Sequence, residues 1–313
     1  MNTQETQNLF RLWDVKWTEE AANSIYRYSP VYKCQYRGQD VIIKRTRRTM
    51  DTAQKLVEWT TSLHSNGIKV VTPVKVENPF IQYKDHTWTM YPFIKGRKYD
   101  GSLQDIYEAG RLLGQIHNKV DTFECARFDW LNFDDEFTND VTNDLQEISS
   151  NLLKNRPEKK EFNILKGRIE DFLTSDFSRL KKKTLPMVNA SWDYKASNLV
   201  YEKDNHPVLI DPDNGGIVPR IVDLALALIL FHTEIETAPS RLFTEEEWTE
   251  FTKGYFEYIT LTEEEKILWQ DVLLFVYFDE ALWAIVDMED DETERQKKFI
   301  YSLTAFNPVK YSL

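Results

Sequence analysis

The feature that most constrains the fold of this chain is a change in its hydrophobic pattern near residues 92–101. Before this point, short runs of β-branched and aromatic residues alternate with turn residues, which is typical of antiparallel strands. Strands are expected over 24–45, 69–76 and 87–91, with one helix over 51–65. Beyond it, most of the chain has helical spacing. The sequence therefore predicts an α+β fold, with a small antiparallel sheet followed by a larger, mostly helical part.

Pro92, Gly96 and Gly101 fall where the hydrophobic pattern changes. Proline and glycine commonly interrupt helices and strands, so these residues mark the boundary between the two parts. We therefore predict an N-terminal lobe over residues 1–95 and a C-terminal lobe over residues 96–313. In the C-terminal lobe we expect helices over 103–120, 139–180 and 263–288, an aromatic loop over 123–137, and short strands over 198–201 and 208–211. Two helix starts carry capping boxes, Thr244 with Glu247 and Thr262 with Glu265.

The composition limits the classes of partner. The 313 residues carry a formal net charge of −12, which argues against a nucleic-acid groove because phosphate backbones attract clustered lysine and arginine. Cys34 and Cys125 match no metal-binding spacing. The longest fully apolar run, 224–231, is far short of the roughly 20 residues that a membrane helix needs. Since the N-terminus also lacks a signal-like pattern, we expect a cytoplasmic protein that binds neither nucleic acid nor membrane.

Four polar side chains carry the candidate chemistry. Lys44 and Asp211 each end an apolar run with the pattern of a strand, and Asp193 precedes Asn198 by five positions. Phosphoryl transfer needs a cation on the phosphates, oxygen ligands for a metal, and a carboxylate that orients the attacking hydroxyl. These four residues are of the types that supply such groups.

Each of these signals is weak alone. A lysine at the end of a strand is most often solvated, and an aspartate five residues before an asparagine also occurs in polar surface turns. Glu58, in the helix expected over 51–65, has the charge to pair with Lys44, but most surface helices carry a glutamate. The order of the residues along the chain, rather than any one of them, favours a common site.

The most specific signal is a combination of three motifs. They are Asp193-x₄-Asn198, Ile210-Asp211 and Pro219-Arg220-Ile221-Val222-Asp223-Leu224-Ala225. With them, the chain resembles the aminoglycoside phosphotransferase and choline kinase-like family of small-molecule kinases over roughly residues 20–235. The resemblance implies a catalytic loop over 191–198, a metal loop over 210–214, and a structural role for Asp223.

The resemblance also implies a two-lobed, protein kinase-like fold and a reaction in which ATP or GTP phosphorylates a hydroxyl, with Mg²⁺ as the metal. Asp193 would be the catalytic carboxylate, and Lys195 would lie near the γ-phosphate. Asn198 and Asp211 would be the metal ligands.

The nucleotide-binding residues follow from the same resemblance. Lys44 would pair with the phosphates, and Glu58 would hold it in place. The segment 90–97 is similar to the family hinge whose backbone binds adenine. The hinge residues expected at the nucleotide are Tyr91, Phe93 and Ile94. The loop that covers the phosphates would fall at residues 28–30, which contain no glycine, so Ser29 is the residue expected there.

Two departures from the family pattern concern the loops. Ser191 and Trp192 stand where the family has histidine and glycine, which leaves the reacting groups intact. Pro212 follows the metal-binding aspartate where an aromatic residue is common, and its fixed φ would stiffen the loop. Asp213 is expected to support or contact the metal.

The acceptor is expected between the catalytic loop and the C-terminal helices. Trp192 and Tyr194 would form an aromatic wall there or else pack into the core. Along the helix expected over 263–288, a single stripe carries the candidate acceptor-binding residues Glu280, Trp283 and Asp287. Two carboxylates and an indole suit a cationic, polyhydroxylated molecule, whereas the alternative is an ordinary solvated acidic face.

Three functions remain open at this stage. The leading hypothesis is an aminoglycoside-type antibiotic kinase or a relative that confers antibiotic resistance. A second is a kinase for a neutral or zwitterionic metabolite, such as a sugar, a choline-like alcohol or homoserine. A third is a nucleotide-binding pseudokinase, which the glycine-free phosphate loop favours, although Lys44, Asp193, Asn198 and Asp211 are all present.

Overall fold

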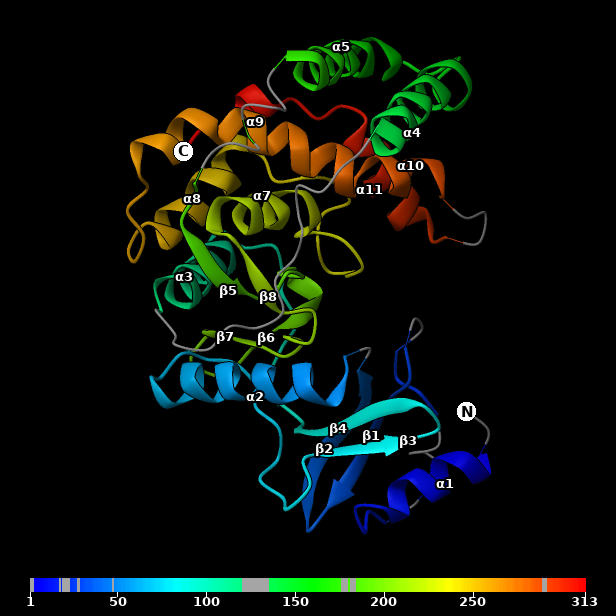
Figure 1. The fold of residues 1–313 in the computed structure, drawn as a ribbon, viewed down its shortest axis with the longest axis vertical. Coiled ribbons are helices and arrows are strands. Elements are labelled where there is room, and N and C mark those ends of the chain that lie inside the picture. Colours follow the sequence, from blue (N-terminus) through cyan, green and yellow to red (C-terminus); the bar gives the residue numbers. More distant parts are fainter. Residues whose placement is uncertain are drawn as a thin grey trace.

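The chain folds into two lobes, a small one built on a β-sheet and a larger helical one (Figure 1). This computed structural model describes residues 3–16, 18, 23–26, 29–46, 48–119, 135–175, 180, 184–288 and 292–313. The expected α+β, two-lobed architecture is confirmed. The sheet ends at Pro92 and the next helix begins at Leu103, so the boundary expected near residue 95 falls in the segment that joins them.

The small lobe contains a four-stranded antiparallel sheet in the order β1-β2-β4-β3. Its strands are β1 (Val31–Tyr36), β2 (Gln39–Thr46), β3 (Phe80–Tyr83) and β4 (His86–Pro92). Arg37 and Gly38, both with positive φ, form the tight turn between β1 and β2. Helix α1 (Thr3–Arg11) packs Leu9 and Phe10 into the core of this lobe. Neither α1 nor β3 was expected from the sequence.

Two expected strands are wrong. The described residues Ser24–Tyr26 form no strand, and the segment 69–76 adds no strand to the sheet, although the N–H of Val74 donates to the carbonyl oxygen of Met90 in β4 at 2.8 Å. Instead, Val70 forms a single parallel bridge with Leu209 of the large lobe. Pro73 has no backbone N–H to donate, which prevents a continuous ladder through this segment. The apolar residues that suggested a strand therefore join the two lobes.

Helix α2 (Met50–Ser65), capped by Thr49, matches the helix expected from the sequence. It lies between the sheet and the large lobe (Figure 1). Its apolar stripe of Leu56, Trp59 and Leu63 belongs to the core of the large lobe rather than to that of the small one. Burial of this stripe fixes the rotation of the helix, and thereby decides which of its charged residues face the solvent.

The large lobe is mostly helical. Its helices are α3 (Leu103–Asn118), α4 (Asp135–Glu147), α5 (Lys159–Ser175), α7 (Arg220–Leu230), α8 (Glu245–Tyr255), α9 (Glu263–Glu280), α10 (Leu282–Val286) and α11 (Glu294–Leu303). Two short antiparallel pairs join β5 (Met187–Ala190) to β8 (Gly216–Pro219), and β6 (Leu199–Tyr201) to β7 (Pro207–Leu209). Most of the aromatic loop expected over 123–137 lies outside the described residues.

The expected helix boundaries hold in part. Both capping boxes form, Thr244 with Glu247 and Thr262 with Glu265. The single helix expected over 263–288 is wrong, because it is interrupted at Ala281 and continues as the short α10. None of the described helices combines the length and the apolar composition needed to cross a membrane.

The motif aspartate Asp223 lies at the centre of the large lobe. It is fully buried on α7, and its carboxylate is 3.0 Å from Nε2 of His117 on α3. The other ring nitrogen of His117 is 3.0 Å from the hydroxyl of Tyr255 on α8. This chain of polar contacts joins three helices, as expected of a structural anchor, because buried polar groups require partners.

Helices α3 and α8 approach closely through glycines. A Cβ built on Gly110 would lie 1.9 Å from the carbonyl oxygen of Phe251, and one on Gly254 would lie 2.2 Å from that of Tyr107. No flexible side chain can yield there, since both obstacles are backbone. The glycines therefore set the distance between the two helices.

We predict that Gly110→Ala lowers the free energy of unfolding by at least about 2 kcal/mol, because the added methyl forces the helices apart. Gly167 of α5 is the matched control, since a Cβ added there would meet no atom within 4 Å. Gly167→Ala should raise the stability by about 0.5–1 kcal/mol through helix propensity. Urea unfolding of both variants checks this, and equal stability of the two would contradict the packing argument.

Candidate active site

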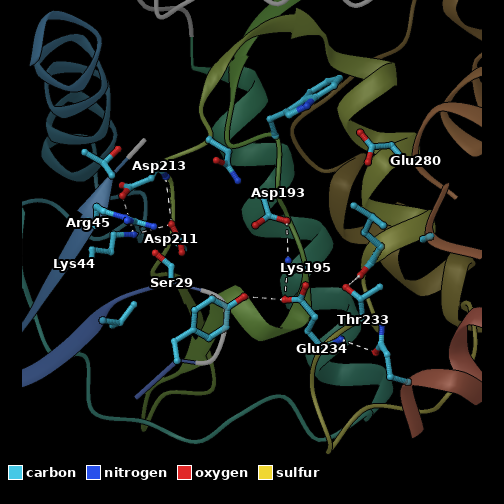
Figure 2. Close-up of a pocket in the computed structure, with 18 of the residues that line it drawn as sticks. Ser29, Lys44, Arg45, Asp193, Lys195, Asp211, Asp213, Thr233, Glu234 and Glu280 are labelled. Atoms are coloured by element: carbon cyan, nitrogen blue, oxygen red, sulfur yellow. Dashed lines mark hydrogen bonds and ion pairs between the residues drawn. The ribbon is translucent and has the colours of Figure 1, made fainter. Parts of the chain in front are cut away.

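A cavity of about 650 Å³ is lined by several of the residues singled out from the sequence (Figure 2). Ser29 and Lys44 reach it from the small lobe, whereas Asp193, Lys195 and Asp211 reach it from the large lobe. The cavity therefore lies where the two lobes meet. Residues far apart in the chain come together there.

Lys44 is the central cation of this site. It projects from β2, and its ammonium lies 2.7 Å from Oδ1 of Asp211 and 3.0 Å from Oδ2 of Asp213. Burial alone would lower the pKa of Lys44, but the two carboxylates outweigh it and raise the pKa above its usual value. Burial also raises the pKa of Asp213, which Lys44 partly offsets. The sequence-based expectation that Lys44 meets Asp211 agrees with this geometry.

Glu58 does not pair with Lys44, and this expectation is wrong. Glu58 is exposed on α2 and accepts a hydrogen bond of 3.4 Å from Gln54. The reason is the rotation of α2, since Leu56 and Trp59 must face the core of the large lobe. Asp213 occupies the place of the second carboxylate beside the lysine.

The metal loop is held from the small lobe by two further side chains. The guanidinium of Arg48 donates to the carbonyl oxygens of Asp213 at 3.1 Å and Asn214 at 2.6 Å. The hydroxyl of Tyr91 donates to Oδ1 of Asp213 at 2.8 Å. Arg48 was not singled out from the sequence, because nothing in its local pattern shows that its partners lie 165 and 166 positions away.

The catalytic loop lies between β5 and β6. The amide nitrogen of Asn198 donates to the carboxylate of Asp193 at 3.0 Å and to its carbonyl oxygen at 2.9 Å. Burial raises the pKa of Asp193, and Lys195, 3.1 Å away, counteracts the rise. Trp192 has a φ of 54° at the position where the related motif has glycine. That left-handed conformation explains why glycine suits this position.

Three expected acceptor residues are at the cavity. Glu280 at the end of α9, Trp283 on α10 and Trp192 all line it. Burial raises the pKa of Glu280 to about 7, and Asp279 adds to the shift. Burial likewise raises the pKa of Asp279 to about 6. The large-lobe end of the cavity thus carries one carboxyl group, Glu280, whose pKa lies near neutral pH, with Asp279 next to it in the chain.

Two other expected acceptor residues are elsewhere. Tyr194 is buried in the core, where its hydroxyl donates to the carbonyl oxygen of Ala109 at 2.7 Å, so it forms no wall of the cavity. Asp287 is exposed beyond the end of α10 and does not line the cavity. The break at Ala281 ends the stripe that placed Asp287 beside Glu280 in the sequence.

The three residues expected at the hinge, Tyr91, Phe93 and Ile94, have different surroundings. Phe93 was expected to bind adenine through its backbone. Its N–H is not free to do so, because it donates to the carbonyl oxygen of Asp40 at 3.0 Å. Its ring lies under the ammonium of Lys33. Ile94 lines a separate cavity beside Val71. Adenine contacts through Tyr91 and Ile94 stay predictions.

The donor set suits a divalent metal that is bound together with phosphates. Asn198 uses its amide nitrogen on Asp193, which leaves the amide oxygen as its acceptor end. The backbone N–H of Ile210 donates to the carbonyl oxygen of Asn198 at 2.9 Å, which brings this residue beside Asp211. Among the described residues, no cluster of three or more His, Cys, Asp or Glu forms a complete metal cage. Mg²⁺ commonly takes one or two carboxylates and completes its shell with phosphates and water.

These features define the class of protein. Residues 27–267 match the model of the phosphotransferase enzyme family (APH), so the chain belongs to this family. The resemblance drawn from the motifs is thereby confirmed, as is the prediction of a phosphotransferase that acts on small molecules. No curated protein sequence matches the chain.

Solved structures of small-molecule kinases share the fold. Amicoumacin kinase hAmiN, in complex with AMP-PNP, Ca²⁺ and Ami, has a TM-score of 0.64 and 17% identity, covering 95% of this chain and 92% of that one. A microcompartment-associated aminopropanol kinase has a TM-score of 0.66 and 14% identity, with 97% and 95% covered. Spectinomycin phosphotransferase APH(9)-Ia, in complex with ADP and spectinomycin, has a TM-score of 0.56 and 16% identity, with 98% and 95% covered.

We predict that Lys44→Met lowers the free energy of unfolding by about 3 kcal/mol, because it leaves the buried Asp213 without its cation. The loss should shrink as the pH falls, since Asp213 then becomes neutral by binding a proton. Glu58→Gln is the control, because Glu58 is exposed and does not touch Lys44. Urea unfolding at several pH values measures both. A larger loss in the Glu58 variant would contradict the assignment of Asp213 as the partner.

Proposed function

We propose that this protein is an ATP-dependent kinase that phosphorylates a hydroxyl of a small cationic molecule. The observation that carries the proposal is the contact of Lys44 with Asp211 at 2.7 Å, in a cavity that Asp193 also lines. It supports a site in which Lys44 of the small lobe binds the phosphates and Asp211 of the large lobe binds the metal. Asp193 would be the catalytic carboxylate in the same cavity.

Each residue of the site has a role in this proposal. Lys44 binds the nucleotide phosphates, and Asp193 orients the acceptor hydroxyl and receives its proton. Lys195 neutralises negative charge on the transferred phosphoryl group. Asn198 and Asp211 would hold Mg²⁺, which offsets the charge of the β- and γ-phosphates when bound. The use of ATP supports a cytoplasmic location.

The cationic acceptor is supported by the carboxyl group of Glu280 at the large-lobe end of the cavity. Glu280 lies there with Asp279 beside it, and the exposed indole of Trp283 offers a face for a cation. Amicoumacin, spectinomycin and aminopropanol are named with the similar structures. Amino alcohols and aminoglycoside-type antibiotics are therefore the first acceptors to test, and an antibiotic acceptor would make the protein a resistance enzyme.

The activity can be tested by ADP release with a panel of acceptors. We expect release to depend on Mg²⁺ and to be stimulated by cationic amino alcohols or aminoglycosides. Stimulation by sugars or other neutral alcohols alone would instead favour the metabolite kinase. Nucleotide binding without release, for every acceptor tried, would favour the pseudokinase.

We predict that Asp193→Asn lowers turnover by roughly 10²–10⁴-fold while nucleotide affinity is kept, because the amide cannot accept the proton of the hydroxyl. Single-turnover kinetics and nucleotide titration measure the two effects separately. Full activity in this variant would show that another group accepts the proton.

The pKa of Glu280 gives a second prediction. As the pH rises through about 7, Glu280 loses its proton, so the KM for a cationic acceptor should fall. A quaternary amino alcohol is the suitable probe, since its own charge does not titrate. Glu280→Gln should raise this KM at pH 8 by about 10–100-fold, the order expected for one close pair of opposite charges in a partly desolvated site, and should remove the pH dependence.

Glu263→Gln on the same helix is the control, because Glu263 is exposed at the start of α9. The charged groups that act on Glu280 are Asp279, Asp193 and Lys195, and none of them changes in either variant. An unchanged KM in Glu280→Gln would exclude Glu280 from acceptor binding.

A further inference from the structure

Lys195 has a second carboxylate partner, which the sequence motifs did not indicate. Its ammonium lies 3.1 Å from Oδ1 of Asp193 and 2.9 Å from Oε2 of Glu234 (Figure 2). The side chain of Lys195 is only 11% exposed. The lysine is therefore held between two carboxylates from different segments of the large lobe.

The backbone around Glu234 is fixed by several contacts. Glu234 has a φ of 55°, and its N–H donates to Oε1 of Gln296 at 3.4 Å. Just before it, the carbonyl oxygen of Phe231 accepts the N–H of Ala196 in the catalytic loop at 2.9 Å. The loop after α7 and the catalytic loop are thus joined beside Lys195. A left-handed φ in a non-glycine residue persists only where its surroundings enforce it.

The small lobe also contacts Glu234. The hydroxyl of Tyr26 donates to Oε2 of Glu234 at 3.2 Å, across the cavity. Ser24 shapes the segment that carries Tyr26, because its hydroxyl oxygen accepts the N–H groups of Tyr26 and Val31. Through the contact of Tyr26 with Glu234, the segment before β1 is connected to Lys195.

We infer that Glu234 is a positioning residue for phosphoryl transfer, which fixes the ammonium of Lys195 beside Asp193 and is itself oriented by Tyr26. An ammonium has three donors, so Lys195 can contact both carboxylates and keep one donor for the transferred phosphoryl group. Without Glu234, the lysine would shift onto Asp193 and compete with the acceptor hydroxyl. The inference rests on the proposed kinase activity.

A double-mutant cycle tests whether Glu234 acts through Lys195. Glu234→Gln should lower kcat by about 10–100-fold, the order expected for a misplaced catalytic group, and should leave both KM values within about threefold. In a Lys195→Ala background the same substitution should have no further effect. Effects that multiply would overturn the inference. So would a raised acceptor KM with unchanged kcat, since Glu234 would then bind the acceptor.

A second measurement does not depend on turnover. Glu234 and Asp193 both raise the pKa of Lys195, so loss of the Glu234 charge should lower that pKa and leave more of the lysine as the reactive free amine. Glu234→Gln should therefore increase the rate of acetylation of Lys195 at pH 9 by about tenfold, which corresponds to a pKa lower by about one.

Glu236→Gln on the same loop is the control, since Glu236 is exposed and forms no ion pair with Lys195. Equal labelling in the wild type and Glu234→Gln would overturn the inference, whereas a wild type without turnover would overturn only the proposed function.

Discussion

The contact of Lys44 with Asp211 and Asp213 is the interaction on which the site depends. A buried ammonium is unfavourable without anionic partners, so the small lobe cannot bury this lysine unless the metal loop of the large lobe meets it. Tyr91 and Arg48 add polar contacts to the same loop. The position of the lobes and the position of Asp211 are therefore set together.

The opposite wall of the cavity is fixed by buried hydrogen bonds within the large lobe. The anchor Asp223 joins α7 to α3 through His117, and Tyr194 ties the catalytic loop to α3 through its hydroxyl. With that loop immobilised, Asp193 and Lys195 face the cavity between Glu234 and the metal loop. Carboxylates outnumber cations along the described lining of the cavity, and this excess is the basis for the proposed metal and the proposed cationic acceptor.

Much of the fold could be predicted because it depends on local chemistry. Helix α2 and both capping boxes formed as expected, since caps and helical periodicity act within a few residues. The segment 69–76 was wrongly predicted as a strand, because the same apolar residues suit a strand or a contact between lobes. The break at Ala281 was also missed, since no proline or glycine marks it.

The sequence by itself determined the family, since the three motifs that indicate it are short and can be recognised locally. Only the tertiary structure decided which charges meet. The rotation of α2 turned Glu58 to the solvent and left Asp213 as the partner of Lys44. Glu234 likewise reaches Lys195 from a loop that is distant along the chain, and such pairings arise from packing, which no local pattern records.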